Sequence, residues 1–341
     1  MPILKQSSYK APFFVRDPHL QTLFTNRFPL FHPPRYERRR ISTHDGDFLD
    51  LDWARIGSKR LAILTHGLEG SSRSSYIQRF TTALNHAGYD VLAWNMRGCG
   101  GEPNRLLRWY HAGDSHDLRR VFSHALFRKR YAEIVLVGFS LGGNIVLKFL
   151  GEYGLNLNTL IKKAVVFSVP CDLQACSLKL ARPENEHYMQ HFLNSLRAKV
   201  LQKRQIFPDK IDTTGLERIR TFEEFDNRYT APLHGFVDAV DYWQKSSSRQ
   251  FLQAIAVPTL IVNAKDDPFL ALECFPFKEA EQSQCVFLET PKHGGHNAFI
   301  SLRRDVTHWA TSRTLCFLNT DLAGTADEVL PQSLSLLASG Q

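Results

Sequence analysis

The sequence lacks long apolar runs. Near its start the most apolar stretch, residues 11–15, is interrupted at once by Arg16 and Asp17, whereas a membrane-spanning helix needs about 20 mostly apolar residues. The start also lacks the basic region, apolar core and small-residue cleavage site of a secretory signal. Together these absences predict a cytoplasmic protein without a transmembrane segment.

Cysteine is scarce and scattered. Six cysteines occur in 341 residues, and only Cys171 and Cys176 lie close together, which predicts neither a disulfide framework nor a zinc site. His293 and His296 have the spacing of two metal ligands, but no third ligand is evident. We therefore expect reduced, mostly buried thiols, no metal and no cofactor.

Acidic residues are outnumbered by basic ones, and the formal net charge is +8. The densest basic clusters, residues 35–40 and 197–204, belong to no recognisable nucleic-acid-binding module, so we expect no nucleic-acid partner. Solvated faces explain most of this charge. A smaller contribution from weak peripheral contact with anionic phospholipid surfaces is also compatible with it, and the oligomeric state is left open.

One serine stands in a glycine-rich segment, Gly138-Phe139-Ser140-Leu141-Gly142-Gly143. The run 134–137 before it is typical of a strand, and residues 144–150 are typical of a helix. A G-x-S-x-G segment in that context is the nucleophile elbow, which exposes a serine hydroxyl at the carboxyl edge of a sheet. A plain glycine turn would look the same, so a catalytic Ser140 requires a base, an acid and an oxyanion hole elsewhere.

Two carboxylates follow the apolar strand predicted over residues 257–262. They are Asp266 and Asp267, and Pro268 comes directly after them. An acid on this loop can hold an imidazole in one tautomer and stabilise its charged form. From its position in the turn we predict Asp266 as the acid, with Asp267 as a turn-forming or capping carboxylate.

Two histidines follow the next predicted strand, residues 286–288. His296 comes after Gly294 and Gly295, which let the backbone approach the serine, whereas His293 precedes them. We therefore predict His296 as the base, and His293 as a supporting or surface residue.

Donors for the oxyanion are expected from backbone N–H groups. One is Leu141, directly after the serine. The other is Leu68 in the loop His66-Gly67-Leu68-Glu69-Gly70, which follows a strand predicted over residues 61–65. His66 could also be read as a base, but a histidine before this glycine is more consistent with ordering the loop.

A second glycine-rich turn, Arg97-Gly98-Cys99-Gly100-Gly101, raises the alternative of a phosphate cradle. It lacks a following Lys-Ser/Thr pair and the spacing of a dinucleotide site. We interpret it as a tight turn in which Arg97 bonds backbone or carboxylate. No partner base supports Cys99 as a nucleophile.

Strand and helix patterns alternate through the first half of the chain, after a predicted hairpin over residues 38–53. This alternation predicts an α/β fold with parallel strands and right-handed crossovers. The alternation stops for roughly 85 residues, which is far longer than an ordinary connection. The predicted organisation is an extended segment without regular structure (1–35), a core (36–170), a helical cap insertion (171–250), a second core part (251–320) and a tail (321–341).

These motifs together resemble the YheT-like branch of the α/β-hydrolases. The resemblance rests on HGLEG (66–70), RGCGGEPN (97–104), GFSLGGN (138–144), KDDPF (265–269) and HGGH (293–296). That branch contains bacterial proteins regarded as esterases and eukaryotic relatives that act on lipid esters. The resemblance implies a mostly parallel sheet with helices on both faces, a helical cap, and a triad of Ser140, Asp266 and His296. The amino-terminal anchor of the eukaryotic relatives is not expected here.

The function expected from these residues is hydrolysis of carboxylic esters through an acyl-enzyme. Lipase, phospholipase or acyltransferase activity on glycerolipids is the alternative. The His-x4-Asp signature of some acyltransferase relatives is absent, which mildly favours water as the acceptor. A non-catalytic binding protein on the same frame is a third reading.

Overall fold

The described strands form one nine-stranded sheet. The computed structural model describes residues 3–24, 33–127, 131–300 and 308–321, and within them the strand order is β1-β9-β8-β7-β6-β4-β5-β3-β2. All neighbours are parallel except the β2/β3 and β3/β5 pairs. The strands are β1 (Ile3–Leu4), β2 (Glu37–Ser42), β3 (Phe48–Ala54), β4 (Arg60–Thr65), β5 (Asp90–Asn95), β6 (Glu133–Phe139), β7 (Ile161–Phe167), β8 (Thr259–Val262) and β9 (Val286–Glu289).

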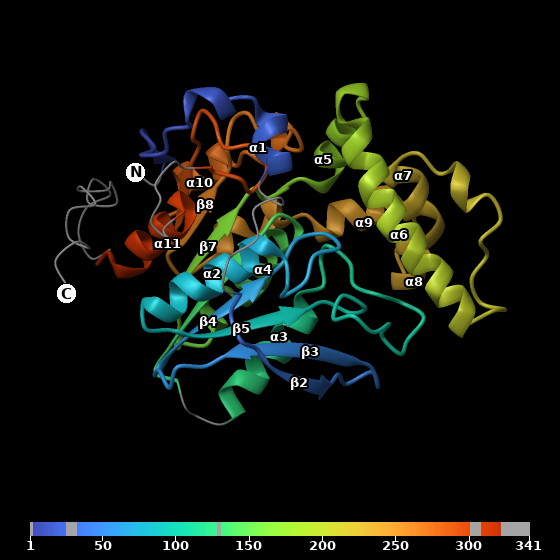
Figure 1. Ribbon diagram of the computed structural model, residues 1–341, viewed down its shortest axis with the longest axis horizontal. Helices are drawn as coiled ribbons and strands as arrows, with labels where there is room; N and C mark the ends of the chain where they lie inside the picture. Colours follow the sequence, from blue (N-terminus) through green and yellow to red (C-terminus); the bar gives the residue numbers. More distant parts are fainter. Residues whose placement is uncertain (1–2, 25–32, 128–130, 301–307, 322–341) are drawn as a thin grey trace.

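Helices cover both faces of the sheet (Figure 1). On one face α2 and α11 pack together, and on the other α3 packs against α4. The helices outside the β7–β8 connection are α1 (Pro18–Phe24), α2 (Ser75–His86), α3 (Ser115–Phe127), α4 (Leu141–Tyr153), α10 (Phe277–Gln282) and α11 (Trp309–Asn319), with short 3-10 turns η1 (Phe13–Val15), η2 (Gly154–Asn156) and η7 (Leu272–Cys274).

The central strands are apolar on both faces because each face meets a layer of helices. On β4, Leu61 and Ile63 belong to the core beneath α3 and α4, whereas Ala62 and Leu64 belong to the core beneath α2 and α11. Alternate side chains of a strand point to opposite faces, so a strand buried on both sides reads as a continuous apolar run. This is why the parallel strands were predictable from the sequence.

The chain between β7 and β8 is largely helical, and its helices gather on one side of the sheet, at the right of Figure 1. Cys171 and Arg249 meet near its two ends through a backbone hydrogen bond of 3.1 Å. Its elements are α5 (Leu173–Leu180), η3 (Pro183–Asn185), α6 (Glu186–Ile206), η4 (Leu216–Arg218), α7 (Phe222–Phe225), the π-helix η5 (Asp226–Thr230), α8 (Ala231–His234), α9 (Ala239–Ser246) and η6 (Ser248–Ala254).

The first residues are more regular than the sequence analysis predicted. They contain β1, which pairs in parallel with β9, then η1 and helix α1. The carboxylate of Asp17 accepts the N–H of Leu20 at 2.8 Å, just before Pro18 opens α1. An Asp followed by Pro is a helix-start signal, and the prediction overlooked it.

Residues 128–130, which fall within the predicted alternation of strands and helices, lie outside the described residues. So does the predicted tail, apart from Asp321. Among the residues that are described, no helix has the length and apolar character required to cross a bilayer.

Candidate active site

Ser140 occupies the turn between β6 and α4. Its backbone has φ 52° and ψ −124°, a conformation that costs a non-glycine residue free energy and is found mainly at functional sites. Its N–H donates to the carbonyl of Phe167 on the neighbouring β7 at 2.8 Å. The serine therefore stands on a strained turn that is held against the carboxyl edge of the sheet.

Glycines allow the loop after β4 to approach this turn. A Cβ atom at Gly142 would lie 2.2 Å from the carbonyl oxygen of His66, which is far inside van der Waals contact. A Cβ atom at Gly67 would lie 3.2 Å from the Cβ of Ser140. The first turn of α4 and the loop after β4 can therefore meet beside the serine only because both positions lack a side chain.

His296 and Asp267 form a buried pair. The Nδ1 of His296 lies 2.9 Å from Oδ2 and 3.1 Å from Oδ1 of Asp267. The carboxylate is fully buried, and its Oδ1 also accepts the N–H of Phe269 at 3.0 Å. A carboxylate in this position orients the imidazole and favours its charged form.

The prediction that Asp266 meets His296 is therefore wrong. Asp266 instead lies 3.2 Å from Nδ1 of His293 and accepts the N–H of Gly295 at 3.0 Å. The two carboxylates are adjacent in a tight turn, closed by a hydrogen bond from the N–H of Asp267 to a carbonyl three residues earlier, and they project toward different histidines. Asp267 points inward and is buried, whereas Asp266 remains partly exposed.

Two further contacts hold His296, and the sequence analysis missed both. Its backbone N–H donates to Oγ1 of Thr22 at 2.9 Å, so α1 supports the loop that carries the histidine. Its ring lies against Phe269, with centroids 4.1 Å apart. Phe269 comes two residues after Asp267, and an aromatic residue at that position was the sequence signal for this ring contact. No local feature pointed to Thr22, because the contact joins residues far apart in the sequence.

The predicted oxyanion donors lie at the same cavity as the serine. Leu68 follows β4, Leu141 opens α4, and both residues line a cavity together with Ser140. Within the described chain, no acceptor is found for the backbone N–H of either leucine. Two free N–H groups beside a serine hydroxyl are what a tetrahedral intermediate requires.

His66 orders its own loop, as we expected. Its Nδ1 lies 2.8 Å from the carbonyl of Gly67, and its Nε2 accepts the N–H of Met96 at 3.1 Å. Burial lowers the pKa of His66 to about 4, so the ring is neutral near pH 7. Because both ring nitrogens are engaged by backbone, His66 is not available as a base.

Two cavities meet at Ser140. The first, of about 100 Å³, lies between the serine and the helices that follow β7, and its walls include Leu173, Phe192, Leu196 and Phe225. It is predominantly apolar. The second, of about 790 Å³, is lined by Ser140 and His296 and by polar side chains that include Glu69, Arg73, Ser75, His187 and His191. The serine therefore faces two spaces, a small apolar one and a larger one whose wall mixes apolar and polar side chains.

In the described part of the chain, no three His, Cys, Asp or Glu side chains lie together as a set of metal ligands.

Burial raises the pKa of the Cys99 thiol to about 12. That thiol is therefore neutral near pH 7 and is a poor nucleophile.

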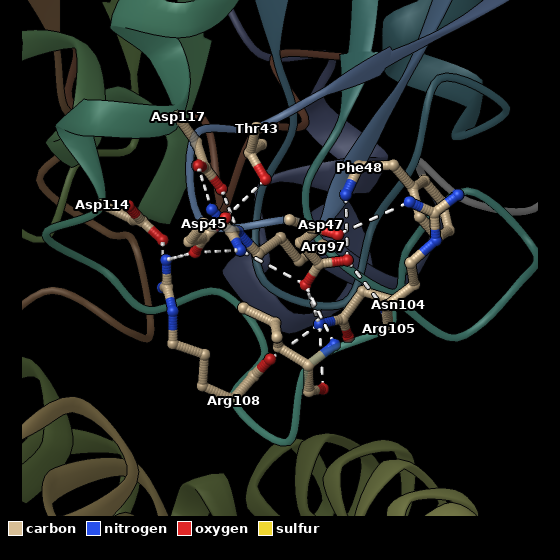
Figure 2. A network of polar contacts seen from close by, with 12 residues as sticks. Thr43, Asp45, Asp47, Phe48, Arg97, Asn104, Arg105, Arg108, Asp114 and Asp117 are labelled. Carbon is tan, nitrogen blue, oxygen red and sulfur yellow. Dashed lines mark hydrogen bonds and ion pairs between the residues drawn. The ribbon is translucent and has the colours of Figure 1, made fainter.

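Arg97 lies in a buried ionic network (Figure 2). Its Nε and Nη2 donate to both oxygens of Asp117 at 2.7 Å. Its Nη1 donates to Asp45 at 2.8 Å and to Asp47 at 3.2 Å. The guanidinium is fully buried, and its partners are carboxylates, as the sequence analysis expected. The turn that carries Arg97 is thus joined by ion pairs to the segments that carry Asp45, Asp47 and Asp117.

Comparison with known proteins points in the same direction. A family model described as alpha/beta hydrolase fold matches residues 63–301. The chain is 36% identical over 297 residues to "Putative esterase YheT" of Escherichia coli (strain K12), a match that covers 83% of this chain and 84% of that protein. It is 31% identical over 278 residues to "Phospholipase ABHD3" of Mus musculus, covering 79% of this chain and 67% of the relative.

Among solved structures, the esterase Pf2001 of Pyrococcus furiosus is similar with a TM-score of 0.56. The two chains are 18% identical, and the match covers 83% of this chain and 89% of that one. At this identity the likeness concerns the fold, and it agrees with the predicted mostly parallel sheet between layers of helices.

Proposed function

This chain belongs to the alpha/beta hydrolase fold family, and on that premise we propose that it hydrolyses carboxylic esters through an acyl-enzyme on Ser140. The observation that carries the proposal is the buried pair of His296 and Asp267, with the imidazole in the cavity that Ser140 also lines. The names of its relatives, an esterase and a phospholipase, support an ester hydrolase of the esterase or lipase type.

In the acylation step, Oγ of Ser140 attacks the ester carbonyl while Nε2 of His296 takes its proton. Asp267 keeps the other ring nitrogen protonated and stabilises the imidazolium. The negative oxygen of the tetrahedral intermediate accepts the N–H groups of Leu68 and Leu141. The bond to the leaving alcohol then breaks, and His296 gives its proton to the alkoxide.

In the deacylation step, water takes the place of the alcohol. His296 removes a proton from the water, the resulting hydroxide attacks the acyl carbonyl, and the same two N–H groups hold the oxyanion. Collapse releases the carboxylic acid and returns the proton to Ser140. All of these roles are filled by side chains and backbone of this chain.

The two cavities suggest which part of the substrate goes where. The acyl chain fits the apolar cavity, because burying its methylene groups there contributes about 0.8 kcal/mol each. The leaving group fits the second, larger cavity, where Arg73, His187 and His191 can face a hydrated head group. Helices α5, α6, α7 and α9 supply much of the apolar wall, and we propose that residues 171–250 act as a cap that sets acyl length.

The test is hydrolysis of p-nitrophenyl esters from acetate to palmitate, with wild type beside Ser140→Ala. We expect turnover that depends on chain length and that the variant lacks. Ser312→Ala, a serine on α11 away from both cavities, is the matched control and should keep wild-type rates. Equal turnover in Ser140→Ala would overturn the assignment, and no turnover of any ester would favour a specialised acyltransferase or a binding protein.

A further inference from the structure

Glu69 directly follows the oxyanion donor Leu68 and has a strained backbone. Its φ is 53°, which a side chain tolerates only where neighbouring groups hold it. One of those groups is the Tyr110 hydroxyl, which accepts the N–H of Glu69 at 2.8 Å and donates to its Oε1 at 2.7 Å. The Tyr110 hydroxyl therefore holds both the main chain and the side chain of Glu69, directly beside the donor Leu68.

The same carboxylate forms an ion pair with Lys199 on helix α6. The Nζ to Oε1 distance is 3.0 Å, and the side chains of Lys199 and Glu69 are only 6% and 14% exposed. Burial disfavours an ammonium, but Cys99 and Glu69 hold the pKa of Lys199 above its ordinary value. The Cys99 thiol is itself neutral near pH 7, so Glu69 is the charge that balances this lysine.

Lys199 also contacts the second glycine-rich turn and the clamp on Glu69. Its Nζ lies 3.3 Å from the carbonyl of Gly98 and 4.9 Å from the ring centroid of Tyr110. One ammonium from the helical segment is thus inserted between two loops of the core. A buried charge in such a position is strongly tied to its partner, because separating the two leaves both without compensation.

Helix α6 also forms part of both cavities. Phe192 lines the two cavities, and Leu196, one helical turn before Lys199, lines the apolar one. The helix that would contact the acyl chain is therefore the helix that holds the oxyanion loop.

We propose that the Lys199–Glu69 ion pair is a positioning device that sets the direction of the Leu68 N–H, so that the oxyanion hole is complete only when α6 is seated on the core. This proposal rests on the proposed function, since it assigns a role within that reaction. Lys199 and Glu69 act through the loop and do not touch the reacting atoms.

The test compares two lysines on the same helix. Lys203, one turn beyond Lys199, is also buried, and its ammonium donates to the core carbonyls of Asn104, at 2.6 Å, and Leu106. None of its described contacts is with Glu69. Lys203→Met therefore removes a buried charge and a link between α6 and the core, and it leaves the oxyanion loop untouched.

We expect Lys199→Met to lower kcat on a soluble p-nitrophenyl ester by about tenfold or more, with KM within about twofold, because a misdirected donor weakens transition-state binding. Glu69→Gln, which keeps the side-chain size, should lose about as much. The double variant should fall little further, because both changes remove one interaction. Lys203→Met should keep the wild-type kcat.

A second readout is the affinity of a trifluoromethyl ketone, which forms a tetrahedral adduct with the serine. In Lys199→Met this affinity should weaken in parallel with kcat. A kcat equal to wild type in Lys199→Met and Glu69→Gln overturns the proposal, as does an equal loss in Lys203→Met or a change confined to KM. If Lys199→Met does not fold, Glu69→Gln decides. Activity that survives in Ser140→Ala would instead mean that the proposed function has failed.

Discussion

At the residue scale, one position separates the carboxylate that contacts His296 from the one that contacts His293. Oδ2 of Asp267 lies 2.9 Å from Nδ1 of His296, and the Asp267 side chain is fully buried. Asp266 contacts His293 instead. A carboxylate that loses its charge can no longer hold the imidazole in the tautomer that accepts the serine proton.

We therefore predict that Asp267→Asn lowers kcat by about 10³ to 10⁴, the range found for the acid of other triads. Asp266→Asn, the adjacent control, should retain most of the activity. Steady-state kinetics on one ester decide between them. A larger loss in Asp266→Asn would restore the acid expected from the sequence.

The sequence could locate the acid loop and could not choose the acid. A buried strand ending in Lys265-Asp266-Asp267-Pro268 predicts carboxylates at the carboxyl edge of the sheet. Which one points inward depends on the turn hydrogen bond from Asp267 to Ala264 and on the partner that each loop offers. The contact of His296 with the acid loop was predictable because Gly294 and Gly295 precede it, and glycines mark a close approach of the backbone.

At the element scale, the π-helix η5 carries a partly buried acid at the wall of the apolar cavity. Asp226 accepts the indole N–H of Trp243 at 2.9 Å. Burial raises the pKa of Asp226 to about 6, although hydrogen bonds from Thr230 and Trp243 partly oppose this. The folded protein therefore binds this proton more tightly than the unfolded chain, in which the pKa of an aspartate is about 3.9.

This shift has a defined sign. Between pH 4 and 6 the folded state holds a proton that the unfolded state releases, so the free energy of unfolding falls as the pH rises and stays lower above pH 6. Asp226→Asn has no carboxyl group to titrate, so its free energy of unfolding should not fall with pH in this way. Its amide oxygen can still accept the indole N–H of Trp243. Its free energy of unfolding, relative to wild type, should rise by up to about 3 kcal/mol between pH 4 and 8.

Urea unfolding at several pH values measures this difference. Asp209→Asn, at an exposed position, is the control and should follow wild type throughout. A constant difference between Asp226→Asn and wild type at every pH would contradict the account.

Elements were predictable where periodicity is strong. The parallel strands are apolar on both faces, and α2 and α3 alternate apolar and polar sides, so both kinds of element leave a clear pattern. Helix α1 was missed because its seven residues are few for a periodic pattern, and its role depends on a distant contact from Thr22 to His296.

At the scale of the whole molecule, the ion pairs of Arg97 connect three parts of the core. Its carboxylate partners lie in the β2–β3 turn (Asp45 and Asp47) and on α3 (Asp117), and Arg97 itself follows β5. The side chain is fully buried, so its removal leaves Asp47 and Asp117 without the guanidinium that pairs with them, whereas Asp45 keeps Arg108.

Arg97→Met should therefore lower the free energy of unfolding by about 3 to 5 kcal/mol, the usual cost of removing one partner of a buried ion pair. Thermal and urea unfolding measure it. Arg39→Met, which breaks a surface pair with Glu37, is the matched control and should stay close to wild type. Similar melting of the two variants would mean that the buried network contributes little.

The overall architecture followed from the order of motifs along the chain, because serine, acid and histidine loops each come after a strand of one parallel sheet. What did not follow is how the helices after β7 are seated. Lys199 in contact with Glu69 joins residues that no local pattern relates, and the contact exists only once the two segments have packed.

The central claim is that Ser140 is the activated nucleophile, and the most direct test is labelling with a fluorophosphonate followed by mass spectrometry of the peptides. We predict a single adduct on Ser140 in wild type, no adduct in Ser140→Ala, and slow labelling in Asp267→Asn. Folded wild-type protein that stays unlabelled, or that is labelled at another residue while Ser140 remains unmodified, would contradict the account.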